Sequence, residues 1–168
     1  MSGGWKQRLT LASCILHKPK LLLLDEPTGG MDSRARRDFW DELSLLSEHK
    51  ITTLISTHYM DEALRCTYLV YLSQRLIAEG TKMDVINKAG LTTWRIKGEN
   101  LIELSKTLKK AEGIDQVAFF GDELHVSGKD EVHFLESIAP FKNYHWTKIT
   151  PSLEDAFISL SRDFEGNK

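Results

Sequence analysis

The sequence predicts an α/β fold in two parts, for three reasons. Up to Gly90, short apolar runs alternate with helical stretches, which is typical of a parallel sheet covered by helices on both faces. After Gly90, apolar and polar residues alternate within the strands, which indicates a sheet with one solvated face. The 168 residues are 41% hydrophobic and 27% charged, as in soluble domains with real cores. We therefore expect one domain over residues 1–90 and a second over residues 91–168.

The first domain is expected to alternate strands and helices. Its predicted strands span residues 20–25, 51–56, 68–72 and 76–78, the last two paired with each other. Its predicted helices span residues 2–17, 33–48 and 61–65, and a last helix runs from a capping box at Thr81 to a stop at Gly90.

The second domain is expected to follow the order βαββαβ. Strands are predicted around residues 94–96, 117–119, 124–126 and 144–149, with helices near 101–108 and 132–138. Gly121 and Asp122 form the hairpin turn between the central strands. A further helix is expected to start with Thr150 as its cap and Pro151 at its first position. This order predicts a small ferredoxin-like α+β domain.

Composition excludes several classes of protein. A net charge of -2 with no basic block argues against a dedicated nucleic-acid binder. Cys14 and Cys66 lack metal-ligand spacing and are interpreted as reduced thiols. The longest aliphatic run, residues 21–24, is far too short to span a membrane, and no signal peptide is recognised. A role at a membrane would therefore depend on a partner.

Two acidic residues follow the most apolar predicted strand. Asp25 and Glu26 come directly after four leucines, at the carboxyl end of the strand, where open α/β sheets bind their ligands. A carboxylate there can bind Mg²⁺, and its neighbour can polarise an attacking water. His58 follows the next predicted strand and is expected at the same edge of the sheet. The alternative interpretation is two solvated acids and a structural histidine.

Glycines precede the first predicted helix. Ser2, Gly3 and Gly4 leave its first turn open to close approach by another molecule, and free N–H groups there favour phosphate. A capped helix after a glycine turn is the simpler alternative. Asp32 follows a second glycine pair and is expected to cap the helix that begins at Ser33.

Taken together, these segments resemble four motifs of ATP-binding cassette (ABC) ATPases, in the family's order. Residues 2–8, here called the signature segment, are similar to the signature motif, and residues 21–26 to the Walker B strand with its catalytic glutamate. Residues 30–32 resemble the D-loop, and His58 the switch histidine. The resemblance covers residues 1–90. Residues 91–168 resemble the accessory C-terminal domain of ABC-2-type drug and antibiotic exporters.

The resemblance implies how these residues would act on ATP and Mg²⁺. In family members two cassettes pack head to tail, and each ATP lies between the Walker A loop of one and the signature motif of the other. Asp25 would hold the Mg²⁺ shell, Glu26 would act on the attacking water, and His58 would hold the γ-phosphate and that water in line. The nucleotide-binding residues it implies, with Asp32 linking the two sites, are Ser2, Gly3, Gly4, Gln7 and Asp32.

One departure from the family pattern bears on activity. The Walker A loop, Gly-x-x-x-x-Gly-Lys-Ser/Thr, is absent from these 168 residues, as is the Q-loop stretch. We therefore expect the chain to be the C-terminal part of a cassette ATPase, an α/β partial P-loop NTPase. Alone it is expected to be inactive. Phosphoryl transfer depends on positioning and electrostatic stabilisation of the phosphates, and the missing Walker A loop would supply much of both.

Three functions are compatible with the sequence. The first is the ATPase of an ABC-2-type exporter, held at the cytoplasmic face of the inner or plasma membrane by its permease, with a second cassette and no nucleic acid as partner. The second is a soluble cassette ATPase that acts on DNA or the ribosome, against which the acidic balance argues. The third is a non-enzymatic fragment that binds a partner.

Overall fold

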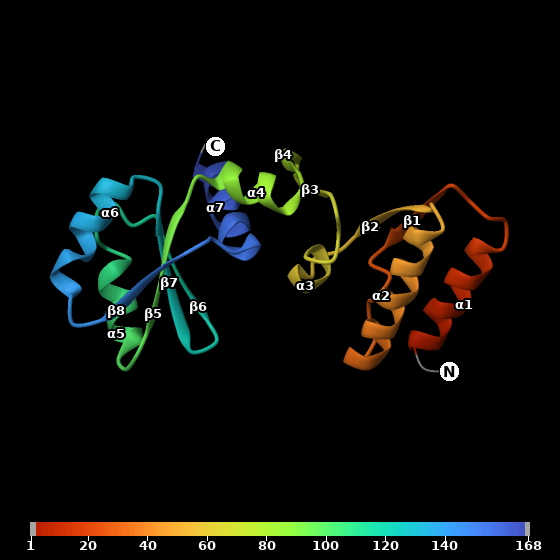
Figure 1. The fold of residues 1–168 in the computed structure, drawn as a ribbon, viewed down its shortest axis with the longest axis horizontal. Coiled ribbons are helices and arrows are strands. Elements are labelled where there is room, and N and C mark those ends of the chain that lie inside the picture. The colour runs from red at the N-terminus through yellow and green to blue at the C-terminus, as the bar shows by residue number, and fades with distance from the viewer. Residues whose placement is uncertain (1–2, 167–168) are drawn as a thin grey trace. The chain divides into compact units, whose positions relative to one another are not determined.

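The computed structural model describes residues 3–166, and the contacts of the chain divide into two units, Met1–Ala63 and Leu64–Lys168. The first unit contains one sheet and the second contains two, each with helices of its own unit (Figure 1). The first unit comprises α1 (Gly3–Ile15), β1 (Leu21–Asp25), α2 (Ser33–Glu48), β2 (Thr52–Ser56) and α3 (Met60–Ala63). Within residues 3–166, no helix has both the length and the hydropathy needed to cross a bilayer.

Strands β1 and β2 run parallel, as their apolar sequences predict. Their register pairs each residue from Leu21 to Asp25 with its counterpart from Thr52 to Ser56, so both strands end at the same edge. Helix α2 contributes the buried side chains of Phe39, Trp40 and Leu43. Leu22 is 5% exposed, whereas Leu23 is 66% exposed. The first unit therefore does not cover both faces of these strands as expected, because Leu23 stays largely exposed.

Ion pairs and a glycine join α1 to α2. The Arg8 guanidinium lies 3.4 Å from the Asp38 carboxylate and 3.2 Å from that of Glu42, both on α2. At Gly4, an added Cβ would lie 3.2 Å from the Cβ of Ala35, tighter than ordinary van der Waals contact. The absence of a side chain at Gly4 thus lets the first turn of α1 approach the first turn of α2.

The second unit begins with a hairpin and a helix. Strands β3 (Leu69–Ser73) and β4 (Arg75–Gly80) pair antiparallel, as predicted. Helix α4 (Lys82–Ala89) starts with the expected capping box, in which Thr81 and Asp84 bond reciprocally. It ends at Gly90, whose φ of 62° is left-handed and suits glycine.

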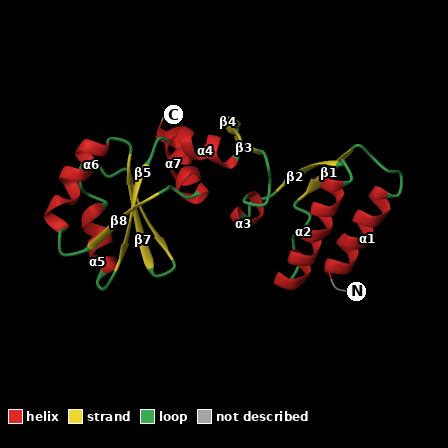
Figure 2. Ribbon diagram, in the orientation of Figure 1, coloured by secondary structure: helices red, strands yellow, loops and turns green. Residues whose placement is uncertain are grey.

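The sheet that follows confirms the ferredoxin-like prediction. Its strands lie in the order β6-β7-β5-β8, and every neighbouring pair is antiparallel (Figure 2). Elements in chain order are β5 (Thr92–Lys97), α5 (Leu101–Leu108), β6 (Gln116–Phe120), β7 (Glu123–Gly128), α6 (Glu131–Ile138), a 3₁₀ turn (Ala139–Phe141) and β8 (His145–Ile149). Apolar residues of β5, β6 and β7 pack with those of α5 and α6 in one core, which includes Ile96, Leu104, Leu108, Leu124, Val126 and Phe134.

The last helix, α7 (Leu153–Gly166), starts later than predicted. Ser152 is the cap: its hydroxyl accepts from the backbone N–H of Asp155, and its own N–H donates to the Asp155 carboxylate at 2.8 Å. The prediction of Thr150 and Pro151 as the helix start is therefore wrong by two residues. The reciprocal Ser152–Asp155 pair satisfies the helix N-terminus better than a Thr150 cap would.

The boundary between the two units also differs from the expected division at residues 90 and 91. It lies between Ala63 and Leu64, because α4 packs on α7 and the hairpin reaches the same helix. The Tyr71 ring of β3 meets the Phe157 ring edge-on at 4.3 Å, and its hydroxyl bonds with that of Ser161. Whether residues 64–90 belong to the ATPase domain in the family sense stays a prediction.

Candidate functional site

The predicted acids lie at the shared carboxyl edge of β1 and β2. Asp25 is paired in register with Ser56, whose hydroxyl donates to the Asp25 carboxylate. The backbone N–H of Glu26 lies 3.1 Å from the carbonyl oxygen of Ser56 and 3.0 Å from its hydroxyl oxygen. A single serine on β2 therefore holds both acids, and sequence reasoning did not identify it.

Glu26 and His58 are in contact, as expected for two residues at one edge. The Nδ1 atom of His58 lies 3.1 Å from Oε1 of Glu26. Both side chains are more than half exposed, at 60% for His58 and 57% for Glu26, so a ligand can reach them. Glu26 also has a φ of 40°, a left-handed conformation that costs a non-glycine residue energy and is frequent at functional sites.

The segment after Glu26 folds into consecutive turns that end at α2. The N–H of Gly29 donates to the Glu26 carbonyl at 3.0 Å, and Gly30 has a φ of 74°, which glycine adopts without strain. Asp32 then accepts hydrogen bonds from the N–H groups of Arg34 and Ala35 at 3.0 and 2.8 Å. The predicted cap is thus present, and the Asp32 carboxylate is engaged by its own helix.

A buried glutamate, missed in the sequence, connects the two loops of the site. Glu62 is 1% exposed and accepts hydrogen bonds from the hydroxyls of Thr28 and Thr57, at 2.5 and 2.6 Å. Thr28 lies two residues after Glu26, and Thr57 immediately precedes His58. The Arg36 guanidinium approaches Glu62 to 3.8 Å and compensates its charge. Glu62 therefore fixes the loop that carries Glu26 against the loop that carries His58.

The signature segment is placed only in part. Ser2 lies outside the described residues, and Gly3 is the first residue of α1. Gly4 lies against Ala35 and Met31, at the end of the turns that follow Glu26. Gln7 is half-buried on α1. The structure thus groups Asp25, Glu26 and His58 at one edge and Gly4 beside the start of α2.

The acidic edge fits the way proteins bind Mg²⁺. Mg²⁺ keeps several waters and takes one or two carboxylates together with substrate phosphates. Asp25 is exposed, and Ser56 occupies only one of its carboxylate oxygens, Oδ1. Within residues 3–166, no group of three or more His, Cys, Asp or Glu side chains could hold a metal alone. Asp25 could therefore hold Mg²⁺ only as one ligand among waters and phosphate oxygens.

Comparison with known proteins finds similarity to ABC transporter proteins. The family model for the ABC transporter matches residues 1–29. The Nod factor export ATP-binding protein I of Neorhizobium galegae is 35% identical over 164 residues, 96% of this chain and 47% of that protein. These matches support a fragment of an ABC transporter ATP-binding protein. Another relative within these ABC transporter proteins, Nod factor export ATP-binding protein I of Cupriavidus pinatubonensis, is 32% identical over 96% of this chain and 50% of its own length.

These matches cover only part of the related proteins. The chain spans about half the length of the curated ABC transporter relatives that it matches. Among solved structures, the dimeric structure of MJ0796, a bacterial ABC transporter cassette, is similar over 48% of this chain and 36% of its own, with 29% identity and a TM-score of 0.45.

Proposed function

We propose that this ABC transporter chain is part of the ATP-hydrolysing subunit that energises an exporter of the ABC-2 type. The observation that carries the proposal is the contact of Glu26 with His58 at 3.1 Å, next to Asp25 at the carboxyl edge of a parallel sheet. The Nod factor relatives are named as export ATP-binding proteins, which supports a role in export.

The proposed roles follow from what each side chain can reach. Glu26, held at its backbone by Ser56, polarises the attacking water, and His58 orients that water and the terminal phosphate. Asp25 contributes one oxygen to the Mg²⁺ shell. Ser2, Gly3, Gly4 and Gln7 would cover an ATP held by the Walker A loop of a second cassette, with Asp32 at the interface between the two.

The uncovered leucines of the first unit support a larger ATPase domain. Leu21, Leu23 and Leu54 are 53%, 66% and 59% exposed, although parallel strands are normally covered on both faces. In the proposal, further strands and helices of the complete domain cover them. The permease would hold the assembly at the cytoplasmic face of the membrane, without a nucleic-acid partner.

Substitution of the acid tests the catalytic assignment. In a complete protein that contains a Walker A loop, Glu26→Gln should lower ATP turnover by about 10²-fold or more, since the amide cannot accept the water's proton. ATP should still bind, as measured by isothermal titration. His58→Ala should act similarly, and Glu48→Gln, on an exposed residue at the end of α2, is the control. Wild-type turnover in either site variant would contradict that residue's role.

The kind of partner separates this proposal from a cassette ATPase that acts on DNA or the ribosome. Affinity purification of the complete protein from detergent-solubilised cells should recover integral membrane proteins. Recovery of nucleic acid or ribosomal proteins instead would favour the alternative.

The 168 residues alone are proposed to lack ATPase activity. A Walker A loop supplies most contacts to the β- and γ-phosphates, and none occurs in this sequence. Isothermal titration with Mg-ATP should show at best weak binding, and a phosphate-release assay should show no turnover above a Glu26→Gln control. Micromolar affinity for ATP would contradict the proposal.

A further inference from the structure

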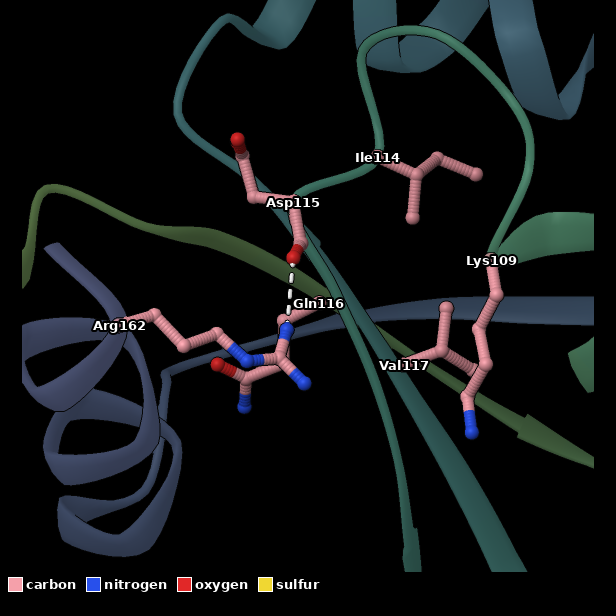
Figure 3. A pocket seen from close by; sticks show the side chains of 6 residues that line it. All are labelled: Lys109, Ile114, Asp115, Gln116, Val117 and Arg162. Atoms are coloured by element: carbon pink, nitrogen blue, oxygen red, sulfur yellow. Dashed lines mark hydrogen bonds between the residues drawn. The ribbon is translucent and has the colours of Figure 1, made fainter. Parts of the chain in front are cut away.

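A cavity of about 280 Å³ lies in the second unit, at the start of the edge strand β6. We call it the β6-edge cavity. Its lining comes from the end of α5, the turn before β6, β6 itself and α7, and consists of Lys109, Ile114, Asp115, Gln116, Val117 and Arg162 (Figure 3). All of these residues lie outside the edge that carries Glu26 and His58.

The side chain of Gln116 has no hydrogen-bond partner among the described residues. It is 2% exposed, and both its Nε2 and its Oε1 are buried. In the same sheet, Thr93 bonds with Ser127 at 2.8 Å and His125 with Asp155 at 3.2 Å. The indole Nε1 of Trp94 is also buried without a partner, but Gln116 leaves both a donor and an acceptor unpaired. An amide buried without partners is costly, because its hydrogen bonds to water are lost and not replaced. Gln116 therefore provides one donor and one acceptor for a ligand in the cavity.

Two cationic side chains line the same cavity as the amide. Arg162 donates from Nη1 to the backbone carbonyl of Asp115 at 2.9 Å, which leaves further N–H groups of its guanidinium for a ligand. Lys109 contributes an exposed ammonium to the lining. The Asp115 carboxylate accepts from the N–H of Lys129 at 2.6 Å, and Figure 3 shows it turned away from the guanidinium. The cavity thus offers two cations and one buried amide.

We propose that the β6-edge cavity binds a small oxyanion that also carries a hydrogen-bond donor. The anion would accept from Arg162, from Lys109 and from Nε2 of Gln116, whereas its hydroxyl or amino group would donate to Oε1 of Gln116. Ile114 and Val117 provide an apolar wall for a short carbon chain. A hydroxy- or aminocarboxylate and a phosphate both have this chemistry.

Nuclear magnetic resonance of the 168-residue chain tests the proposal directly. L-lactate and inorganic phosphate represent the two sources of the anion, and acetate is the matched control without a hydroxyl group. Saturable shifts of the Gln116 side-chain amide signals are expected with lactate or with phosphate. Lactate should bind more tightly than acetate. If neither lactate nor phosphate moves these signals saturably, or if acetate binds as well as lactate, the proposal is wrong.

Three variants distinguish binding in the cavity from nonspecific attraction of the anion to surface lysines. Gln116→Leu and Lys109→Met should each weaken binding by about tenfold, the loss expected for one hydrogen bond to a charged group. Lys110→Met removes the neighbouring exposed lysine, which does not line the cavity, and should leave binding unchanged. Dispersed amide spectra establish that each variant is folded. Equal weakening in the Lys109 and Lys110 variants would overturn the proposal, and Lys109→Met decides it if Gln116→Leu does not fold.

Discussion

At the scale of single residues, polar side chains on neighbouring loops determine the geometry of the candidate site. Ser56 holds the Glu26 backbone and the Asp25 carboxylate, and Glu62 holds the threonines beside Glu26 and His58. Neither could be recognised from the sequence, because a serine in a strand and a glutamate in a short helix are usually solvated. The acids and the histidine could be predicted, since they lie at or just past the carboxyl ends of two apolar strands.

The buried position of Glu62 predicts a measurable loss of stability in the first unit. In Glu62→Gln the amide nitrogen cannot accept, so one of the hydroxyls of Thr28 and Thr57 loses its acceptor. The free energy of opening of β1 and β2 should fall by about 1–3 kcal/mol. Native-state hydrogen exchange of their backbone amides measures this quantity.

Asp61→Asn provides the matched control for Glu62. The Asp61 side chain is 70% exposed and lies 3.9 Å from Arg36, so its loss should cost less than about 0.5 kcal/mol. An unchanged opening energy in Glu62→Gln would show that the hydroxyls find other partners.

At the scale of elements, hydrophobic periodicity and turn residues predicted nearly every strand and helix. Helix α2 begins at the predicted Ser33. The predicted hairpin at Gly121 is present between β6 and β7 of the ferredoxin-like sheet. The Thr150–Pro151 pattern places the start of α7 two residues too early, although Ser152 and Asp155 have the same capping-box spacing that located α4. Only the position of Asp155, three residues after Ser152, distinguishes the true cap.

The turn between α5 and β6 contains a glycine that packs against the backbone of α6. Gly113 has a φ of 77°, and an added Cβ would lie 2.7 Å from the carbonyl carbon of His133. Gly113→Ala should destabilise the second unit by about 3 kcal/mol, from left-handed strain and steric overlap together. Gly121→Ala, at a φ of 61° with no atom within 4 Å of the added Cβ, should cost only about 1 kcal/mol. Urea unfolding followed by circular dichroism compares the two, and equal costs would mean that α6 shifts to make room.

At the scale of the whole chain, the division into units depends on long-range contacts. The change in hydrophobic pattern at Gly90 predicts a domain boundary there. This pattern reflects only local structure, so it does not show which distant elements pack together. In the structure, α4 packs on α7 and the Tyr71 ring packs on Phe157, so residues 64–90 belong to the same unit as the C-terminal sheet. The sequence predicts the apolar side chains of α7. It does not predict that they pack on α4.

Limited proteolysis distinguishes the two boundaries. Residues 64–68 form an irregular segment between α3 and β3, and Arg65 within it is exposed. Lys88 is also exposed, but it lies in the last turn of α4 beside the buried Ala89. Trypsin should therefore cut first after Arg65 and leave a resistant fragment that begins at Cys66, identified by its mass. A resistant fragment that begins at Ala89 would instead support the boundary expected from the sequence.

The Tyr71 contact supplies the matched variant for this experiment. Tyr71→Ala removes the ring that packs on Phe157 and the hydroxyl that bonds with Ser161. Loss of an aromatic pair and a hydrogen bond weakens the attachment of the hairpin to α7, so local opening of residues 64–90 becomes more frequent. Cleavage after Lys88 should then be faster than in the wild-type chain at the same protease concentration. Tyr68→Ala, at a 57% exposed position before β3, should not change that rate. An equal rate in the Tyr71 and wild-type chains would mean that α4 alone holds the segment on α7.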